Sequence, residues 1–163
     1  MVHAMNVLSD TSHADIPVHQ VEQLQKIISK LFQCCQERIQ YQCDKFGLHD
    51  AEIRCLMLFG EERYLTVKGI APKLNVVKSR VTKIVNGLIG KKLVQKVKDP
   101  NDSRIILFSL TPKGQTKLED INGFMLNIHA NLLSLVQPDQ RHTLLANLET
   151  LKLSMESVKE MMD

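Results

Sequence analysis

The chain has 163 residues, a net charge of +3 and a hydrophobic content of 44%, with few aromatic side chains. This composition is ordinary for a soluble globular protein of one domain. No stretch approaches the roughly 20 apolar residues that a membrane-spanning helix needs, which excludes a membrane partner. Residues 1–16 lack the basic start and apolar run of a signal peptide, so we expect a mobile arm and a cytoplasmic protein with reduced thiols.

Residues 17–47 have the pattern of one long helix. Apolar side chains follow a three-and-four spacing from Val18 to Ile39. Pro17 suits the first turn of such a helix, and Gly47 is a natural stop. A second helix is predicted over residues 50–59.

The next predicted helix is short. Thr66 is expected to cap its N-terminus, and it should end near Leu74. Gly69 and Pro72 are poor helix formers, and Pro72 lies beyond the first turn, so this helix should be short or irregular.

A further helix, predicted over residues 78–91, has two distinct faces. One is an apolar stripe that we expect to pack on the domain, made of Val77, Val81, Ile84, Val85 and Leu88. The other carries hydrogen-bond donors and no acid, namely Lys78, Ser79, Arg80, Thr82, Lys83 and Asn86. Nothing on the polar face would repel a phosphate group.

Two runs rich in β-branched or aromatic residues, 93–98 and 105–110, predict strands. The turn-forming sequence DPNDS between them makes the pair a hairpin. Thr111 and Pro112 then cap and begin a helix that reaches about residue 136, and a last helix follows. The predicted fold is mostly α-helical with one small β-hairpin.

Charge is distributed unevenly along the chain. From Arg63 to Lys117 there are thirteen Lys and Arg against two Asp, a net charge of +11. The rest of the chain has eight basic and sixteen acidic residues, a net charge of −8. An ordinary solvated surface does not explain why one third of the chain has only two acidic residues. This separation of charge indicates a polyanionic partner.

Two short helices followed by a basic hairpin are the order of a winged helix-turn-helix domain. An α-helix fits the major groove of B-DNA, where the polar face of residues 78–91 could contact base edges. A hairpin with Arg104 at its tip could insert that side chain into a neighbouring minor groove. We therefore expect double-stranded DNA as the partner, with Asp102, Ser103 and Arg104 as the contact residues of the hairpin.

Two stretches of the sequence resemble the MarR family of regulators: LTVKGIAPKLNVVKSRVTKIVNGLIGKKLV and DPNDSRIILFSLTPKG. The second contains the family's wing signature, from Asp102 and Arg104 through Leu110 and Thr111 to Gly114. The resemblance departs at Val77, where the family usually has a Ser N-cap, and at Gly69 and Pro72, which replace helix formers.

The resemblance implies a homodimer that represses transcription. It also implies that Lys83 is the basic residue of the recognition helix and that Asp102 holds the wing residue Arg104 in its pose. Small-molecule effectors in the family bind between the dimer helices and the DNA-binding lobe. No cofactor is implied.

The terminal helices give a separate argument for a homodimer. They are amphipathic, yet too few elements remain in one subunit to cover their apolar side chains. We expect a dimerisation helix at residues 17–47, a DNA-binding domain at 48–114 and two dimerisation helices at 115–163. Two-fold symmetry would place two recognition helices about 34 Å apart, one turn of DNA, so the operator should be pseudo-palindromic.

The four cysteines, Cys34, Cys35, Cys43 and Cys55, leave a second interpretation open. One or more could form a redox switch in a regulator of the same fold, or all could be small apolar packing residues. The family's hydroperoxide sensors carry their reactive cysteine at a position that aligns near Gln25 here, so that mechanism does not transfer.

Other classes of function have less support. A zinc site would need these cysteines with His19, His49 or His129, but no Cys-x-x-Cys or His-x-x-x-His pair exists, and His49 is better placed to cap the helix at 50–59. No phosphate loop, nucleophile elbow or other catalytic motif indicates an enzyme. A winged helix used only for protein contacts is the more distant alternative, because such a wing has no need to exclude acids.

Overall fold

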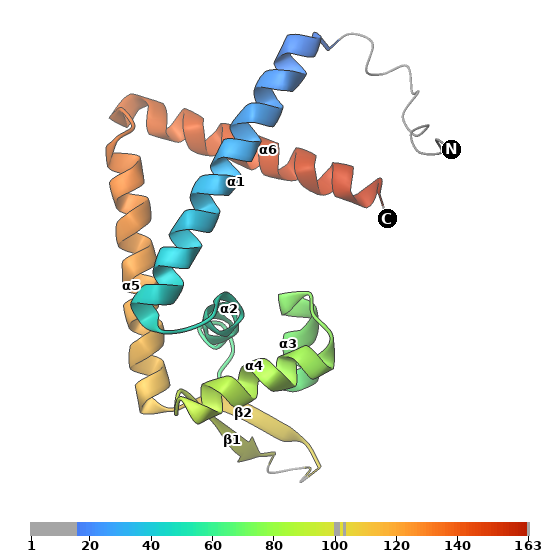
Figure 1. Ribbon diagram of the computed structural model, residues 1–163, viewed down its shortest axis with the longest axis vertical. Coiled ribbons are helices and arrows are strands. Elements are labelled where there is room, and N and C mark those ends of the chain that lie inside the picture. Colours follow the sequence, from blue (N-terminus) through green and yellow to red (C-terminus); the bar gives the residue numbers. More distant parts are fainter. Residues whose placement is uncertain (1–15, 100–101, 103, 163) are drawn as a thin grey trace. The chain divides into compact units, whose positions relative to one another are not determined.

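The computed structural model describes residues 16–99, 102 and 104–162. In chain order they form α1 (Val18–Phe46), α2 (Asp50–Leu58), α3 (Val67–Leu74), α4 (Lys78–Gly90), β1 (Val94–Lys98), β2 (Ile106–Leu110), α5 (Pro112–Ser134), the short 3-10 helix η2 (Pro138–Gln140) and α6 (Arg141–Glu160) (Figure 1). The mostly helical fold with a two-stranded hairpin confirms the predicted fold class. The chain divides into two compact units, one ending at Ile53 and the other beginning at Arg54.

The hydrophobic core of the second unit lies between the end of α2, α3, α4, the hairpin and the start of α5. Its largest fully buried side chains include Leu56, Ile70, Leu88 and Ile121. The predicted apolar stripe of α4 is buried from Val81 to Leu88. The expectation for Val77 was wrong: its side chain is 70% exposed, because residue 77 lies before the first turn of α4 and not on its inner face.

Threonine side chains fix the start of two helices. The Thr66 hydroxyl accepts a hydrogen bond of 3.0 Å from the Gly69 N–H, and the Thr111 hydroxyl accepts one of 3.0 Å from the Gly114 N–H. Both predicted caps are confirmed. At α1, Pro17 occupies the extended N-cap position and not the first turn, one residue earlier than expected.

Helix α3 is short, as its glycine and proline predicted. It spans eight residues and includes Pro72, which has no N–H to continue the hydrogen-bond ladder. Asn75 ends it in the left-handed conformation with a φ of 55°, which Asn tolerates better than most residues. The chain then needs only two residues to begin α4.

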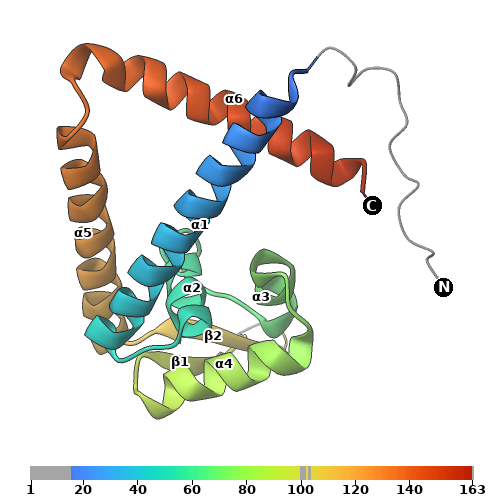
Figure 2. The same ribbon diagram turned by 45° about the horizontal axis from the view of Figure 1, so that its top comes forward.

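The hairpin has a third partner that the sequence did not indicate. Strands β1 and β2 pair antiparallel from Val94 with Leu110 to Lys98 with Ile106. Leu65 then bridges to Phe108 on the other side of β2, with N–H···O distances of 3.0 and 2.8 Å. This bridge ties the segment that enters α3 to the hairpin (Figure 2).

The first turn of α5 approaches the backbone at Leu93, between α4 and β1, very closely. A Cβ atom built on Gly114 would lie 1.9 Å from the Leu93 carbonyl oxygen. The Thr111 N–H donates to the same oxygen at 3.0 Å, and the Thr111 hydroxyl donates to the Lys92 carbonyl at 2.7 Å. This packing is the physical reason for a glycine in the wing signature.

We predict that Gly114→Ala lowers the free energy of unfolding by about 2–4 kcal/mol, because the backbone of α5 must move away from Leu93. Gly90→Ala is the matched control, since a Cβ there meets nothing within 4 Å. That change should be neutral or stabilising by up to about 1 kcal/mol. Urea denaturation at one fixed protein concentration measures both, and equal midpoints for the two variants would disprove the close approach.

Candidate nucleic-acid interface

The outer face of α4 presents the predicted polar residues together. All six, namely Lys78, Ser79, Arg80, Thr82, Lys83 and Asn86, are exposed, while the opposite stripe is buried. The first turn contains no acid. The Thr82 hydroxyl donates to the Lys78 carbonyl at 3.1 Å, which leaves its oxygen as an acceptor. The face can therefore donate hydrogen bonds to base edges or phosphates.

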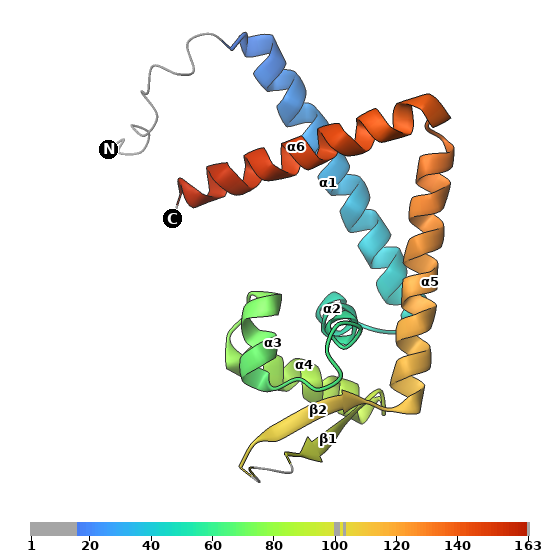
Figure 3. The ribbon, with the colours of Figure 1, turned by 180° about the vertical axis from the view of Figure 1, so that it is seen from behind.

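The tip of the hairpin is held by carboxylates that accept from the backbone. Asp102 Oδ1 accepts from the Arg104 N–H at 2.9 Å, and Asp99 Oδ1 accepts from the Asp102 N–H at 3.1 Å. Asp102 thus orders the main chain at Arg104, whose side chain is exposed. Ser103, the third predicted contact residue of the hairpin, lies outside the described residues. In Figure 3 the hairpin extends away from the start of α5.

Not every cation of the basic segment is available to a partner. Lys73 forms ion pairs with Glu62 and Glu61, which lie just before the basic segment that begins at Arg63. The hydrogen bond that the Lys73 ammonium donates to the Glu62 carboxylate raises the pKa of Lys73, with desolvation opposing it. Lys96 and Lys98 on β1, in contrast, are exposed beside the hairpin tip. Exposed cations of this segment therefore lie on α4 and on the hairpin, and others, such as Lys68 and Lys113, lie outside these two elements.

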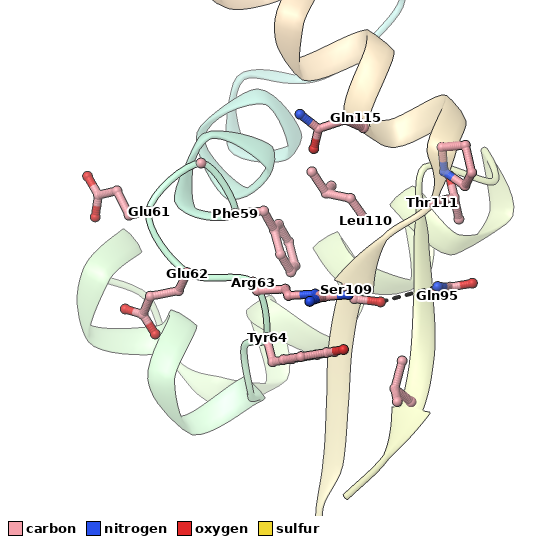
Figure 4. Close-up of a pocket in the computed structure, with 13 residues that line it drawn as sticks. Phe59, Glu61, Glu62, Arg63, Tyr64, Gln95, Ser109, Leu110, Thr111 and Gln115 are labelled. Atoms are coloured by element: carbon pink, nitrogen blue, oxygen red, sulfur yellow. Dashed lines mark hydrogen bonds between the residues drawn. The ribbon is translucent and has the colours of Figure 1, made fainter.

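A cleft of about 690 Å³ lies at the root of the hairpin within the second unit (Figure 4). We call it the wing-root cleft; its lining includes Phe59, Arg63, Tyr64, Gln95, Ser109 and Gln115. The Arg63 guanidinium lies 5.4 Å from the centre of the Tyr64 ring, and Gln95 Nε2 donates to Ser109 Oγ at 3.3 Å. The sequence did not reveal this cleft, since its residues come from four separate segments.

The cysteines differ in their access to solvent. Cys34 and Cys35 are exposed, Cys43 is half-buried and Cys55 is buried. Burial, and then the charges of Asp50 and Asp44, raise the pKa of the Cys43 thiol, which lowers its reactive thiolate fraction at neutral pH. Only the adjacent pair on α1 therefore keeps the accessibility that a redox sensor needs.

His49 lies directly before α2, at the position where its cap was expected, and the side chain that completes the cap is the carboxylate of Glu52. The His49 N–H donates to Glu52 Oε2 at 2.9 Å, while the His49 carbonyl accepts from the first turn.

Among the described residues, no group of three His, Cys, Asp or Glu is close enough to hold a metal ion. The same part of the chain contains no helix long and apolar enough to cross a bilayer.

Comparisons with known proteins agree with this geometry. The family model described as MarR family matches residues 48–106. The HTH-type transcriptional repressor MdtR of Bacillus subtilis (strain 168) is 28% identical over 117 residues, which cover 72% of this chain and 76% of that protein.

Solved structures share the fold over most of the chain. The YusO protein from Bacillus subtilis matches with a TM-score of 0.69 and 27% identity, over 86% of this chain and 99% of that one. A complex of S. aureus MepR with DNA matches with a TM-score of 0.67 over 80% of this chain and 98% of that one. At 19% identity, the match to MepR shows a shared fold alone.

Proposed function

Because this chain belongs to the MarR family of DNA-binding winged-helix transcription regulators, we propose that it is a repressor that binds a pseudo-palindromic operator as a homodimer and releases it on a small-molecule signal. The observation that carries the proposal is the exposed, acid-free face of α4 beside a basic hairpin. A relative that shares over a quarter of the aligned residues is named a repressor. Members of the family are regulators and not enzymes, as the missing catalytic motifs suggested.

In this proposal, α4 lies in the major groove and the hairpin reaches a minor groove. Lys83 and its neighbours on α4 contact bases and phosphates, and Arg104 enters the minor groove with its main chain ordered by Asp102. A cytoplasmic location is part of the same proposal, because a repressor must have access to the chromosome. A winged helix used only for protein contacts has less support, because such a protein would have no polyanionic partner for the basic face of α4.

The dimer is supported by apolar surface that one chain leaves uncovered. Helix α6 has no buried residue, and Gln42 is the buried residue of α1. Yet both helices carry large exposed apolar side chains, among them Leu24, Phe32, Leu145, Leu148 and Leu153. Burial of apolar surface contributes roughly 25 cal/mol of favourable free energy per Å². A second copy of the chain is the simplest partner that would bury these side chains. We propose α1, the second half of α5 and α6 as the dimerisation region.

For DNA binding, we expect Arg104→Ala to weaken operator affinity by about 1–3 kcal/mol per half-site, with the dimer still folded. Lys83→Ala should also weaken binding. If its partner is a phosphate, the slope of log K against log salt should fall by about 2 per dimer, because each contact contributes about 0.9. Fluorescence anisotropy over a salt series measures both effects on an operator selected from random duplex DNA. The matched control is Lys73→Ala, because the Lys73 ammonium is already paired with Glu62 and Glu61; wild-type affinity for Arg104→Ala would refute the wing assignment.

For the dimer, Leu145→Asp should shift the protein from dimer to monomer, since a charge would be buried in the interface. Asn147→Asp places the same carboxylate on the same helix at an exposed polar position and should leave the dimer intact. Light scattering after size exclusion gives the mass directly. A wild-type chain that is monomeric at micromolar concentration would end the proposal of a dimeric repressor.

For the signal, we place the small-molecule site in the wing-root cleft, which has the volume of a typical ligand pocket. It adjoins the Leu65–Phe108 bridge, so a ligand there could alter how the hairpin and α3 are held. Compounds that release the operator should lose that effect in Gln115→Trp, which fills the cleft and leaves α4 and the hairpin tip unchanged. Release by peroxide that is abolished by Cys34→Ser or Cys35→Ser would instead establish the redox alternative.

A further inference from the structure

The recognition helix α4 begins differently from α3 and α5, the helices that precede and follow it in the chain. Helices α3 and α5 start at Thr66 and Thr111, whose hydroxyls each accept a 3.0 Å hydrogen bond from the third N–H of the helix. Helix α4 starts at Val77, which has the same extended backbone (φ −71°, ψ 153°) but no side chain able to accept. Such a cap is among the least favourable for helix stability.

Val77 gains no packing in return for the missing cap. Its side chain is 70% exposed, while the stripe below it, from Val81 to Leu88, is buried. Among the large apolar side chains of α3, α4 and the turn between them, Val77 is the one that is exposed to solvent. Its neighbours in sequence, Lys78, Ser79 and Arg80, are polar and exposed. Val77 therefore projects an apolar group from a surface otherwise built for hydrogen bonding.

The position of Val77 suits contact with a base. In helix-turn-helix proteins the N-terminal residues of the recognition helix reach the base edges in the major groove. The only apolar group exposed on that floor is the C5-methyl of thymine. A β-branched side chain is stiff about χ1, so little entropy is lost when it is held against such a methyl.

We propose that Val77 is a specificity-determining residue that packs on the C5-methyl of one thymine in each operator half-site. This inference rests on the proposed function, because it requires that α4 enters the major groove. It adds an apolar contact to an interface whose other predicted contacts are polar or charged. Those contacts set affinity and hydrogen-bond readout, whereas Val77 would distinguish thymine from cytosine or uracil at one position.

The test removes the methyl from the DNA without changing base pairing. An operator is first selected from a random duplex library with the full-length wild-type protein. Each thymine of a half-site is then replaced in turn by deoxyuridine, and affinity is measured by fluorescence anisotropy at one salt concentration. At one thymine the wild type should lose about fourfold per half-site, which corresponds to about 0.8 kcal/mol for one methyl group. Replacement in both half-sites should cost about 15-fold.

Two variants separate the contact from helix stability. Val77→Ala and Val77→Ser should both bind thymine and deoxyuridine operators equally at that position. Val77→Ser restores an N-cap hydroxyl, so its melting temperature should exceed that of Val77→Ala. Loss of methyl sensitivity in both variants, despite different stabilities, would show that the side chain contacts the base.

The outcomes distinguish this inference from the function on which it rests. If the wild type selects an operator but no thymine is methyl-sensitive, or if Val77→Ala keeps the wild-type sensitivity, the role of Val77 is refuted and the DNA-binding function stands. If the wild type selects no sequence from the library, the proposed function and the role of Val77 fall together.

Discussion

The close packing of Gly114 against the Leu93 carbonyl is the constraint on which the DNA-binding unit depends. It joins three elements at one point: the chain leaving α4, the return of the hairpin, and the first turn of α5. Lys92, in a left-handed conformation with a φ of 61°, turns the chain into β1 at the same place. A recognition helix and a wing must keep a fixed spacing to meet two grooves of DNA at once. The glycine allows that spacing without a gap or a clash.

Burial is distributed in a way that separates DNA binding from assembly. The buried apolar side chains of the second unit extend from Cys55 to Ile121, and the described chain beyond Ile121 contains none. The winged helix can thus form its own core, whereas α6 and the second half of α5 cannot. The stability of those helices would come from the partner subunit, so folding and dimerisation would be coupled there.

Features encoded locally could be predicted from the sequence, and features formed between distant segments could not. Threonine caps, the short α3 and the hairpin follow from residues a few positions apart, and each agrees with the structure. The Leu65–Phe108 bridge joins residues 43 positions apart through backbone atoms alone, so no side-chain pattern announces it. Val77 fits the apolar spacing of α4, but it lies one residue before the helix, where that spacing no longer fixes the direction of a side chain.

The missing cap at α4 also bears on how the helix would engage DNA. A helix leaves its first N–H groups without intrahelical acceptors, and these carry the positive end of the helix dipole. In α3 and α5 a threonine satisfies one of them, but the first turn of α4 contains neither a capping side chain nor an acid. The first turn of α4, next to the proposed contact residue Val77, therefore has less local stabilisation than the first turns of α3 and α5.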